Sequence, residues 1–433
     1  MESIEMMLAQ IFTEISGTGK WSQYFLLELF SNIFSLQGRV NFANLARFSK
    51  MNEVTFRRNF GKFFDWLGFN FAVFRLFGQS PQGVVLGVVD CSLIPKSGKS
   101  TYGLDRFWSG VAGKAKRGLE ISVLGLIDVA SATAWTLDVT QTPPGLSASE
   151  SASGHSRIDF YTEQLTDCLA CLKAVTYFVA DGFYAKTKIF DAFSLWNKHL
   201  ITKLRPDADL RYRFKGERKK GQRGATPKYG GKVDFKKLDL SLWTEVGADE
   251  KYPYLHLYSE ELYAVKFRRW LRVVLVLNTK TNQYVLLACS DLSLCPRLVL
   301  SYNQLRFQVE FLFRDAKQFA GLTHCQARDE DKLDFHFNMS MSAINLAQVN
   351  RKLNPSVSSM NCLVRRAYNQ KFEAIIILPA VGVQLVKDKE GGCITAGLLQ
   401  PGQDGRNQHF VARHLCLSVG SRQQTQQQTG TAH

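Results

Sequence analysis

Residues 83–92, GVVLGVVDCS, form an apolar run that closes on a carboxylate, and this run decides the fold class. It has the length of a β-strand, is rich in β-branched residues, and ends at Asp90. Residues 121–129 (ISVLGLIDV) and 133–141 (TAWTLDVTQ) have the same character. We therefore expect three neighbouring strands at the start of an α/β domain.

The pattern then alternates between helix and strand. After a loop over residues 142–156, it predicts a helix over about 158–173, a buried strand over 176–181, a helix to about Asn197 and a strand over 199–205. The resulting order, βββαβαβ, is that of a mixed α/β layer.

Asp181 closes the fourth strand as Asp90 closes the first. Sites form at the carboxyl ends of strands in α/β sheets, although an Asp at such a place can also cap the next turn. Two converging aspartates could hold divalent ions such as Mg²⁺. Asp128 also ends a strand and competes with Asp90; we favour Asp90 because hydroxyls and lysines follow it in DCSLIPKSGKS.

The regions on either side divide the chain into five parts. Residues 1–78 have helical periodicity, residues 79–205 form the first part of the core, and residues 206–290 form a basic, β-rich insertion. The basic character starts slightly earlier, since residues 203–237 hold 13 Lys or Arg against 4 Asp or Glu. Residues 291–355 complete the core with helices, and residues 356–433 end in a polar tail, from about residue 420, that we expect to be disordered.

Residues 42–60 have the spacing of a helix-turn-helix, with a break near residues 49–52. The second helix carries Arg57 and Arg58, which could contact DNA. A plain helical hairpin packed on the next domain explains the pattern almost as well.

Overall composition points to a globular protein with an anionic partner. Of 433 residues, 45% are hydrophobic and 21% charged, which excludes a mainly disordered chain. The net charge of +16 favours nucleic acid over a membrane surface. Nine scattered cysteines, an acidic N-terminus and no long apolar run predict a cytoplasmic protein with reduced thiols.

A long helix is predicted from about Tyr302 to Ala320. Within it Arg306, Glu310 and Lys317 share one face, so that a carboxylate lies between two cations. Phosphate chemistry uses such an arrangement, with the carboxylate on a metal and the cations on phosphate oxygens. The alternative is an exposed charged stripe with helix-stabilising ion pairs.

Strand-end Asp90, strand-end Asp181 and a late helix with Glu310, separated by a basic β insertion, resemble the DDE transposases of insertion-sequence family 4. The segments VVDCSLIPKSGKS, FVADGFYAK and RFQVEFLFRDAKQFAGL carry this resemblance, which covers about residues 80–350. It implies an RNase H-like core in which Asp90, Asp181 and Glu310 hold Mg²⁺, with Mn²⁺ as a substitute, and perform catalysis.

The resemblance also implies a location, a substrate and an assembly. The protein would be associated with the nucleoid of a prokaryote. The substrate would be double-stranded DNA, namely the terminal inverted repeats of the element and its target, and the enzyme would work by cut and paste as a homodimer in a synaptic complex. The family's Y-R-E-K signature places Tyr three residues before Arg, whereas Tyr302 lies four before Arg306. We expect the following DNA contacts: Arg306, Lys317, Tyr302, Arg314, Lys96, Lys99, Arg57 and Arg58.

Two other functions stay open: a transposase-derived protein that binds DNA without cutting it, and a stand-alone RNase H-like nuclease. The family's insertion supplies an aromatic ring that stacks on a flipped base, for which Trp243 and Trp270 are candidates, although a core position is the simpler interpretation. Gly98 to Ser100 lack the context of a phosphate-binding loop, and His409 and His414 lack the cysteine pair of a zinc finger.

Overall fold

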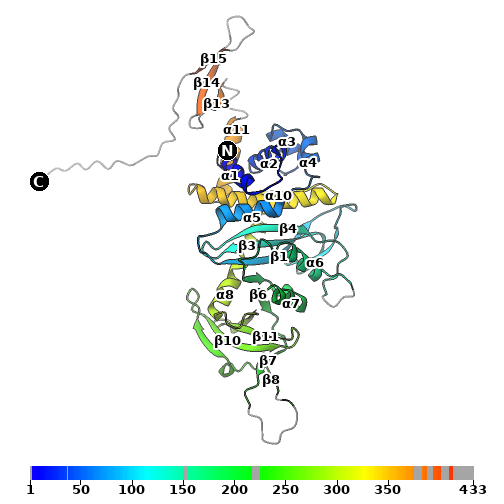
Figure 1. Cartoon of the computed structure of the whole chain (residues 1–433), viewed down its shortest axis with the longest axis vertical. Coiled ribbons are helices and arrows are strands. Elements are labelled where there is room, and N and C mark those ends of the chain that lie inside the picture. The colour runs from blue at the N-terminus through cyan, green and yellow to red at the C-terminus, as the bar shows by residue number, and fades with distance from the viewer. Residues whose placement is uncertain are drawn as a thin grey trace, which may run out of the picture. The chain divides into compact units, whose positions relative to one another are not determined.

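The computed structural model describes residues 2–36, 38–149, 154–216, 225, 227–374, 383–387, 394–400 and 409–412. The chain divides into two compact units, Met1–Val364 and Arg365–His433. The first unit contains the predicted sheet and all of the predicted site residues (Figure 1).

The N-terminal region is helical, as its periodicity predicts. Asn41 and Asn52 cap two short helices by accepting hydrogen bonds of 2.9 Å from the N–H groups of Asn44 and Thr55, which places the break where the sequence predicts it. The helices are α1 (Glu2–Glu14), α2 (Lys20–Ile33), α3 (Phe42–Phe48), α4 (Glu53–Asn59), α5 (Trp66–Val73) and the π-helical turn η1 (Phe74–Gly78).

The first half of the core follows the predicted order, with one added strand. It contains β1 (Val85–Pro95), β2 (Asp105–Ser109), β3 (Lys114–Asp128), β4 (Thr133–Gln141), α6 (Arg157–Asp167), β5 (Tyr177–Ala180), η2 (Gly182–Tyr184), α7 (Thr187–Leu195) and β6 (His199–Leu204). The sequence pattern missed β2, which forms a hairpin with the early, charged half of β3. In the sheet the order is β4-β3-β1-β5-β6, with β1, β5 and β6 parallel and the remaining pairs antiparallel.

The insertion is mainly β, as predicted, but it extends the core sheet instead of standing apart from it. Its elements are β7 (Leu210–Arg213), β8 (Tyr229–Lys232), η3 (Leu240–Leu242), β9 (Thr244–Ala248), β10 (Leu255–Ala264), β11 (Arg269–Asn278) and β12 (Gln283–Cys289). β12 pairs antiparallel with β6 from Leu286↔Leu204 to Cys289↔Ile201. A single β-sheet therefore continues from the core into the insertion, and it contains twelve strands of the described chain.

Helices return after the insertion as α8 (Pro296–Leu305), α9 (Gln308–Phe319), α10 (Glu330–Leu353) and α11 (Met360–Phe372). In Figure 1, α10 lies between the N-terminal helices and the layer of α5 and β4. Phe335 of α10 packs against the rings of Phe25, Phe60 and Trp66. A helix covered on several sides needs partners for its polar residues, and Asn345 provides one example: it bonds both the N–H and the C=O of Thr136 on β4.

The second unit contains β13 (Val383–Lys387), β14 (Ile394–Gln400) and β15 (His409–Ala412), which form an antiparallel sheet in this order. The sequence pattern did not predict these strands. The tail from about residue 420, and His414, lie outside the described residues. Of the helices described, none is both long and apolar enough to cross a membrane.

Candidate active site

Asp90 and Asp181 lie at equivalent positions on two neighbouring parallel strands. The pairing of β1 with β5 ends at Val89↔Ala180, and the two aspartates are the next residues on their strands. Gly87 allows this close pairing, because a Cβ there would meet the ring of Phe178 at 2.2 Å. The two aspartates therefore lie side by side on adjacent strands, at the same height along the sheet.

Asp90 does not end its strand, contrary to the sequence prediction. β1 continues to Pro95, because the long β3 pairs with it from Val85 to Pro95. The edge at Asp90 is created by β5, which is only four residues long. Asp181 then caps the η2 turn, its Oδ1 accepting a 2.7 Å hydrogen bond from the N–H of Phe183.

The predicted long helix is broken at Arg306 and Phe307. α8 ends at Leu305 and α9 begins at Gln308. Between them the N–H of Val309 donates to the C=O of Arg306 (3.1 Å), three residues back, and Glu310 bonds Phe307 in the same way (3.1 Å). This tighter winding interrupts the α-helix just before Glu310.

Arg306 joins the first and third acids. Its guanidinium donates to Asp90 Oδ2 at 3.1 Å and to Glu310 Oε1 at 2.8 Å. The side chains of Arg306 and Asp90 are 12% and 18% exposed, whereas Glu310 is 49% exposed. The pair with Asp90 is therefore shielded from water, and the pair with Glu310 faces solvent.

The charge environment of Asp90 is unusual for a carboxyl. Burial raises its pKa to about 7, and the attraction of Arg306 opposes this rise. Asp181 and Glu310 add to the rise by repulsion, so both lie near enough to Asp90 to interact with it electrostatically. The three predicted acids thus gather in one place.

Lys317 completes the helix face over β1. Its Nζ donates to Ser92 Oγ at 2.7 Å, and burial lowers the pKa of this lysine. Ser92 lies two residues beyond Asp90, on the same side of the strand. Arg306, at the break before α9, and Lys317, on α9, therefore both reach this stretch of β1, although they do not belong to one continuous helix as predicted.

The chemistry of the acids suits a hard divalent cation, because carboxylate oxygens are its preferred ligands. A cation would also relieve the repulsion that Asp90 feels from Asp181 and Glu310. However, no three His, Cys, Asp or Glu side chains of the described part are arranged as a metal-binding cluster. Arg306 lies between Asp90 and Glu310, so metal binding would require it to move.

Residues 73–251 match the family model of the DDE superfamily endonucleases. None of the curated proteins compared matches the chain. The match supports a DDE transposase-like nuclease that acts on DNA. The DDE-like segment contains Asp90 and Asp181 but ends before Glu310, so the match does not cover the third predicted acid.

The other predicted DNA contacts around the DDE-like segment differ in their surroundings. Lys99 is exposed on the loop after β1, and Arg314 is exposed on α9 beside Asp315. Lys96 instead donates to the backbone carbonyls of Cys325 and Ala327. Tyr302 is 6% exposed and packs on Tyr177, so a DNA contact would require its ring to leave this position.

Arg57 and Arg58 are both exposed on α4, which supports their availability to a ligand. Arg57 also pairs with Glu53 and lies over the ring of Phe42. The two helices thus have the predicted spacing, but α4 is only seven residues long.

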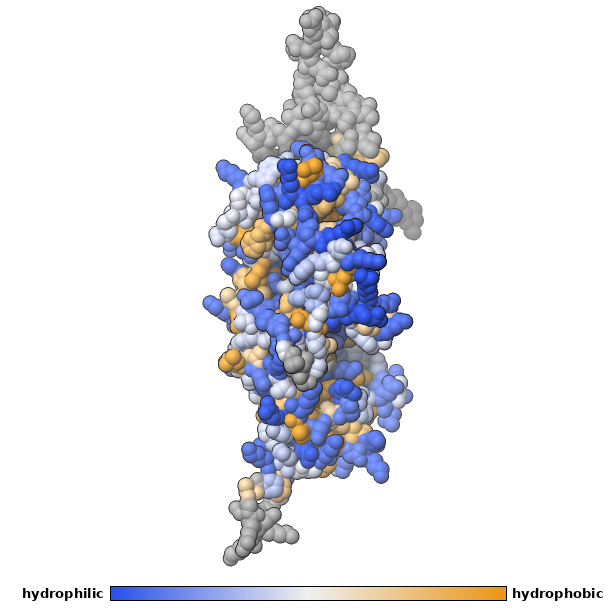
Figure 2. Space-filling model, turned by 90° about the vertical axis from the view of Figure 1, so that its right-hand side faces the viewer, coloured by the Kyte–Doolittle hydropathy of each residue, from blue (hydrophilic) through white to orange (hydrophobic). Residues whose placement is uncertain are grey.

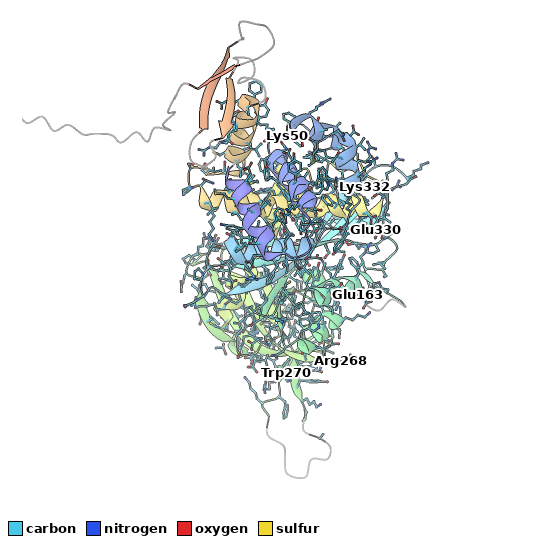
Figure 3. The ribbon with its side chains drawn as sticks, turned by 45° about the horizontal axis from the view of Figure 1, so that its top comes forward. Lys50, Glu163, Arg268, Trp270, Glu330 and Lys332 are labelled. Carbon is cyan, nitrogen blue, oxygen red and sulfur yellow. The ribbon has the colours of Figure 1, made fainter. Side chains whose placement is uncertain are left out.

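Three further residues named from the sequence have structural contacts. Asp128 is the last residue of β3, opposite Val85 at the start of β1, and accepts hydrogen bonds from Ser80 and Ser131, so it fixes turns. Trp243 is 5% exposed, as a core residue would be. Trp270, labelled in Figure 3, lies under the guanidinium of Arg213 at 4.8 Å.

Sequence reasoning missed three exposed aromatic rings next to the acids. Phe183 follows Asp181, and Phe307 and Phe311 flank Glu310; they are 36%, 50% and 45% exposed. Figure 2 shows a mainly hydrophilic face with small apolar patches. The signal in the sequence was an aromatic residue within three positions of Asp181 and of Glu310.

Proposed function

We propose that this protein is a DDE-type transposase that cleaves DNA ends and transfers strands in a metal-dependent reaction. The observation that carries the proposal is the register of β1 and β5, which brings Asp90 and Asp181 to one level, with Glu310 joined to Asp90 through Arg306. The strand order β4-β3-β1-β5-β6 supports an RNase H-like core, and the DDE endonuclease match supports the reaction class.

The residues would divide the work as follows. Oxygens of Asp90, Asp181 and Glu310 would hold Mg²⁺, or Mn²⁺ in its place. With metal bound there, the site would activate a water or 3′-hydroxyl and stabilise the leaving oxygen. Arg306 would leave the carboxylates and, with Lys317, donate to DNA phosphate oxygens next to them.

The rest of the chain would bind the DNA. We assign the terminal inverted repeats to exposed basic residues, including Arg57, Arg58 and Lys99, and to the basic insertion. Since contacts of this kind go to phosphates, affinity should fall steeply with salt. A synaptic homodimer follows from the resemblance to insertion-sequence transposases.

One observation favours the alternative of a DNA-binding protein that does not cut. Arg306 neutralises Asp90 and Glu310 where a cation would be needed. If Arg306 stays there in the presence of Mg²⁺, the acids have a structural role and the protein binds DNA without cutting it.

The experiment is a cleavage assay on a supercoiled plasmid that carries this protein's gene with its flanking DNA. Wild type should nick or excise the segment in Mg²⁺ or Mn²⁺ and not in EDTA. Asp181→Asn and Glu310→Gln should bind the same DNA but leave it intact, whereas Asp315→Asn, on the same helix as Glu310, should cut like wild type. DNA binding without cleavage by wild type would support the alternative, and cleavage by Asp181→Asn would refute the proposed site.

A further inference from the structure

A hairpin made of β2 and the first part of β3 extends the sheet beyond the end of β1. β1 pairs with β3 only as far as Gly118, whereas β2 pairs with β3 from Gly118 back to Lys114. Asp90 pairs with Val123, and the stretch of β3 from Val123 to Lys114 spans about 30 Å at the rise of a β-strand. The hairpin therefore projects past Asp90, in the direction in which β1 runs.

The base of this hairpin is anchored in the core. The ring of Phe107 is fully buried. Arg157, the first residue of α6, lies over that ring at 4.5 Å and donates to the C=O of Arg106 at 3.2 Å. Asp105 accepts a 2.9 Å hydrogen bond from the N–H of Gly145. The core thus fixes where the two strands start, and the outer part of the hairpin is left to meet a partner.

The outer part of the hairpin exposes two apolar side chains. Val111, in the turn, is fully exposed, and Trp108, on β2, is 64% exposed. The turn itself is ordered, because the N–H of Ala112 donates to the C=O of Ser109 at 3.1 Å. Water is a poor environment for both apolar side chains, so a partner that covers them gains free energy.

The same segment is strongly basic. Residues 106–117 contain four cations and no acid. All four cations are exposed: Arg106, Lys114, Lys116 and Arg117. Arg106 lies opposite Arg117 in the hairpin, and the two lysines lie on the other face, because side chains alternate along a strand. Both faces of the hairpin therefore carry positive charge.

We propose that the β2–β3 hairpin is a DNA-binding ribbon that enters a groove of the duplex tip first. The cations on its two faces bind phosphates on the two walls of the groove, and Trp108 and Val111 contact the base edges at its floor. The major groove is about 12 Å wide, admits a two-stranded β-ribbon and offers apolar contacts at its thymine methyl groups. Duplex DNA therefore complements both the charge and the apolar tip of the hairpin.

The choice of partner rests on the proposed function. The hairpin lies within residues 73–251, which match the DDE superfamily endonucleases. Its reach of about 30 Å beyond Asp90 is close to one helical turn of DNA, about 34 Å, so a duplex with a phosphate at the acids can present a groove to the hairpin. An anionic membrane surface would also suit cations around an apolar tip, and the experiment below distinguishes the two partners.

The test measures binding of the full chain to a fluorescent duplex of about three helical turns, taken from the DNA that flanks the gene. EDTA is present, so cleavage is not needed. Lys114→Gln combined with Lys116→Gln should lower the slope of log affinity against log salt by about 1.8, since each phosphate contact contributes about 0.9. Trp108→Ala combined with Val111→Ser should weaken binding about tenfold through lost apolar contact and leave the slope unchanged, because the charge is the same.

Two exposed residues at the other end of the strands provide matched controls. Lys173 lies just before β5, and Leu195, which is 84% exposed, lies just before β6. Lys173→Gln and Leu195→Ser should bind DNA with the affinity and salt slope of wild type. Thermal unfolding of the hairpin variants should match wild type, since their substituted side chains are exposed.

The outcomes separate this proposal from the proposed function. Wild-type affinity and slope in both hairpin variants would overturn the ribbon, even if the protein cleaves DNA. The expected losses would support the ribbon, even if no cleavage is found. Flotation with phosphatidylglycerol vesicles tests the membrane: vesicle binding that depends on Trp108 and Val111, with a DNA affinity that does not, would also overturn the proposal.

Discussion

Replacing Asp90 by Asn should make the protein more stable at alkaline pH, although it removes a partner of Arg306. Burial, with Asp181 and Glu310 adding to it, raises the pKa of Asp90 from 3.8 to about 7 in the folded chain. Between these values the folded chain binds more protons than the unfolded chain. The free energy of unfolding of wild type therefore falls as pH rises through this window, and Asp90→Asn lacks this loss.

The size of the effect follows from the shift. Each unit of difference in pKa corresponds to about 1.4 kcal/mol. Between pH 5 and pH 8 the advantage of Asp90→Asn over wild type should grow by about 2 to 3 kcal/mol. The 18% exposure of the Asp90 side chain keeps solvent screening small.

The assay is urea unfolding in EDTA at pH 5 and pH 8, followed by the same titration at pH 8 with Mg²⁺. Under the proposed function, Mg²⁺ at about a hundred times its dissociation constant should stabilise wild type by about 2.7 kcal/mol and Asp90→Asn much less. Asp334→Asn is the matched control: burial raises the pKa of Asp334 to about 6, but this residue lies on α10, so its variant should keep the Mg²⁺ response. An Asp90→Asn advantage that does not grow with pH would refute the electrostatic reasoning, and an equal Mg²⁺ response in all three proteins would refute the metal site.

Two other predictions concern the scaffold. Asn345→Ala should lower the free energy of unfolding by about 2 to 4 kcal/mol, because the buried N–H and C=O of Thr136 both lose their partner. Urea unfolding at pH 7 measures this loss. A change below about 1 kcal/mol would contradict the prediction. Gly87→Ala should destabilise the protein by more than about 1 kcal/mol, because its Cβ would meet the ring of Phe178 at 2.2 Å. Gly231→Ala is the control: it has open space around it and should be nearly neutral. Thermal unfolding of both variants and wild type measures the difference.

The strands of the core and the N-terminal helices could be predicted because their signals are local. Apolar runs such as 83–92 and 176–181 identify strands without knowledge of their partners. The sequence did not predict β2 because this strand is only five residues long and Phe107 is its one buried residue, so it contains no apolar run. The sequence also did not predict the extension of the sheet into the insertion, because the pairing of β12 with β6 joins segments about 80 residues apart.

In the candidate site too, features with a local sequence signal could be predicted and features set by tertiary packing could not. Asp90 and Asp181 could be named because each follows an apolar run, and their meeting requires only the parallel register of two strands. The place of Glu310 depends on the packing of α9 against β1, which periodicity does not give. The contact of Lys96 with the α9–α10 loop was equally invisible, because a lysine after a strand has the same local signal whether it binds phosphate or a backbone carbonyl.

Arg306 connects the two states that the site must have if it cleaves DNA. In the structure its guanidinium partly offsets the burial and repulsion that raise the pKa of Asp90, so it supplies some of the positive charge that a cation would bring. A cation and this guanidinium compete for the same oxygens of Asp90 and Glu310. When the cation binds, Arg306 loses both partners and becomes available to a phosphate, as the exposed position of Glu310 allows. The binding of metal and of DNA should therefore favour each other, because one side chain has to leave the acids for both.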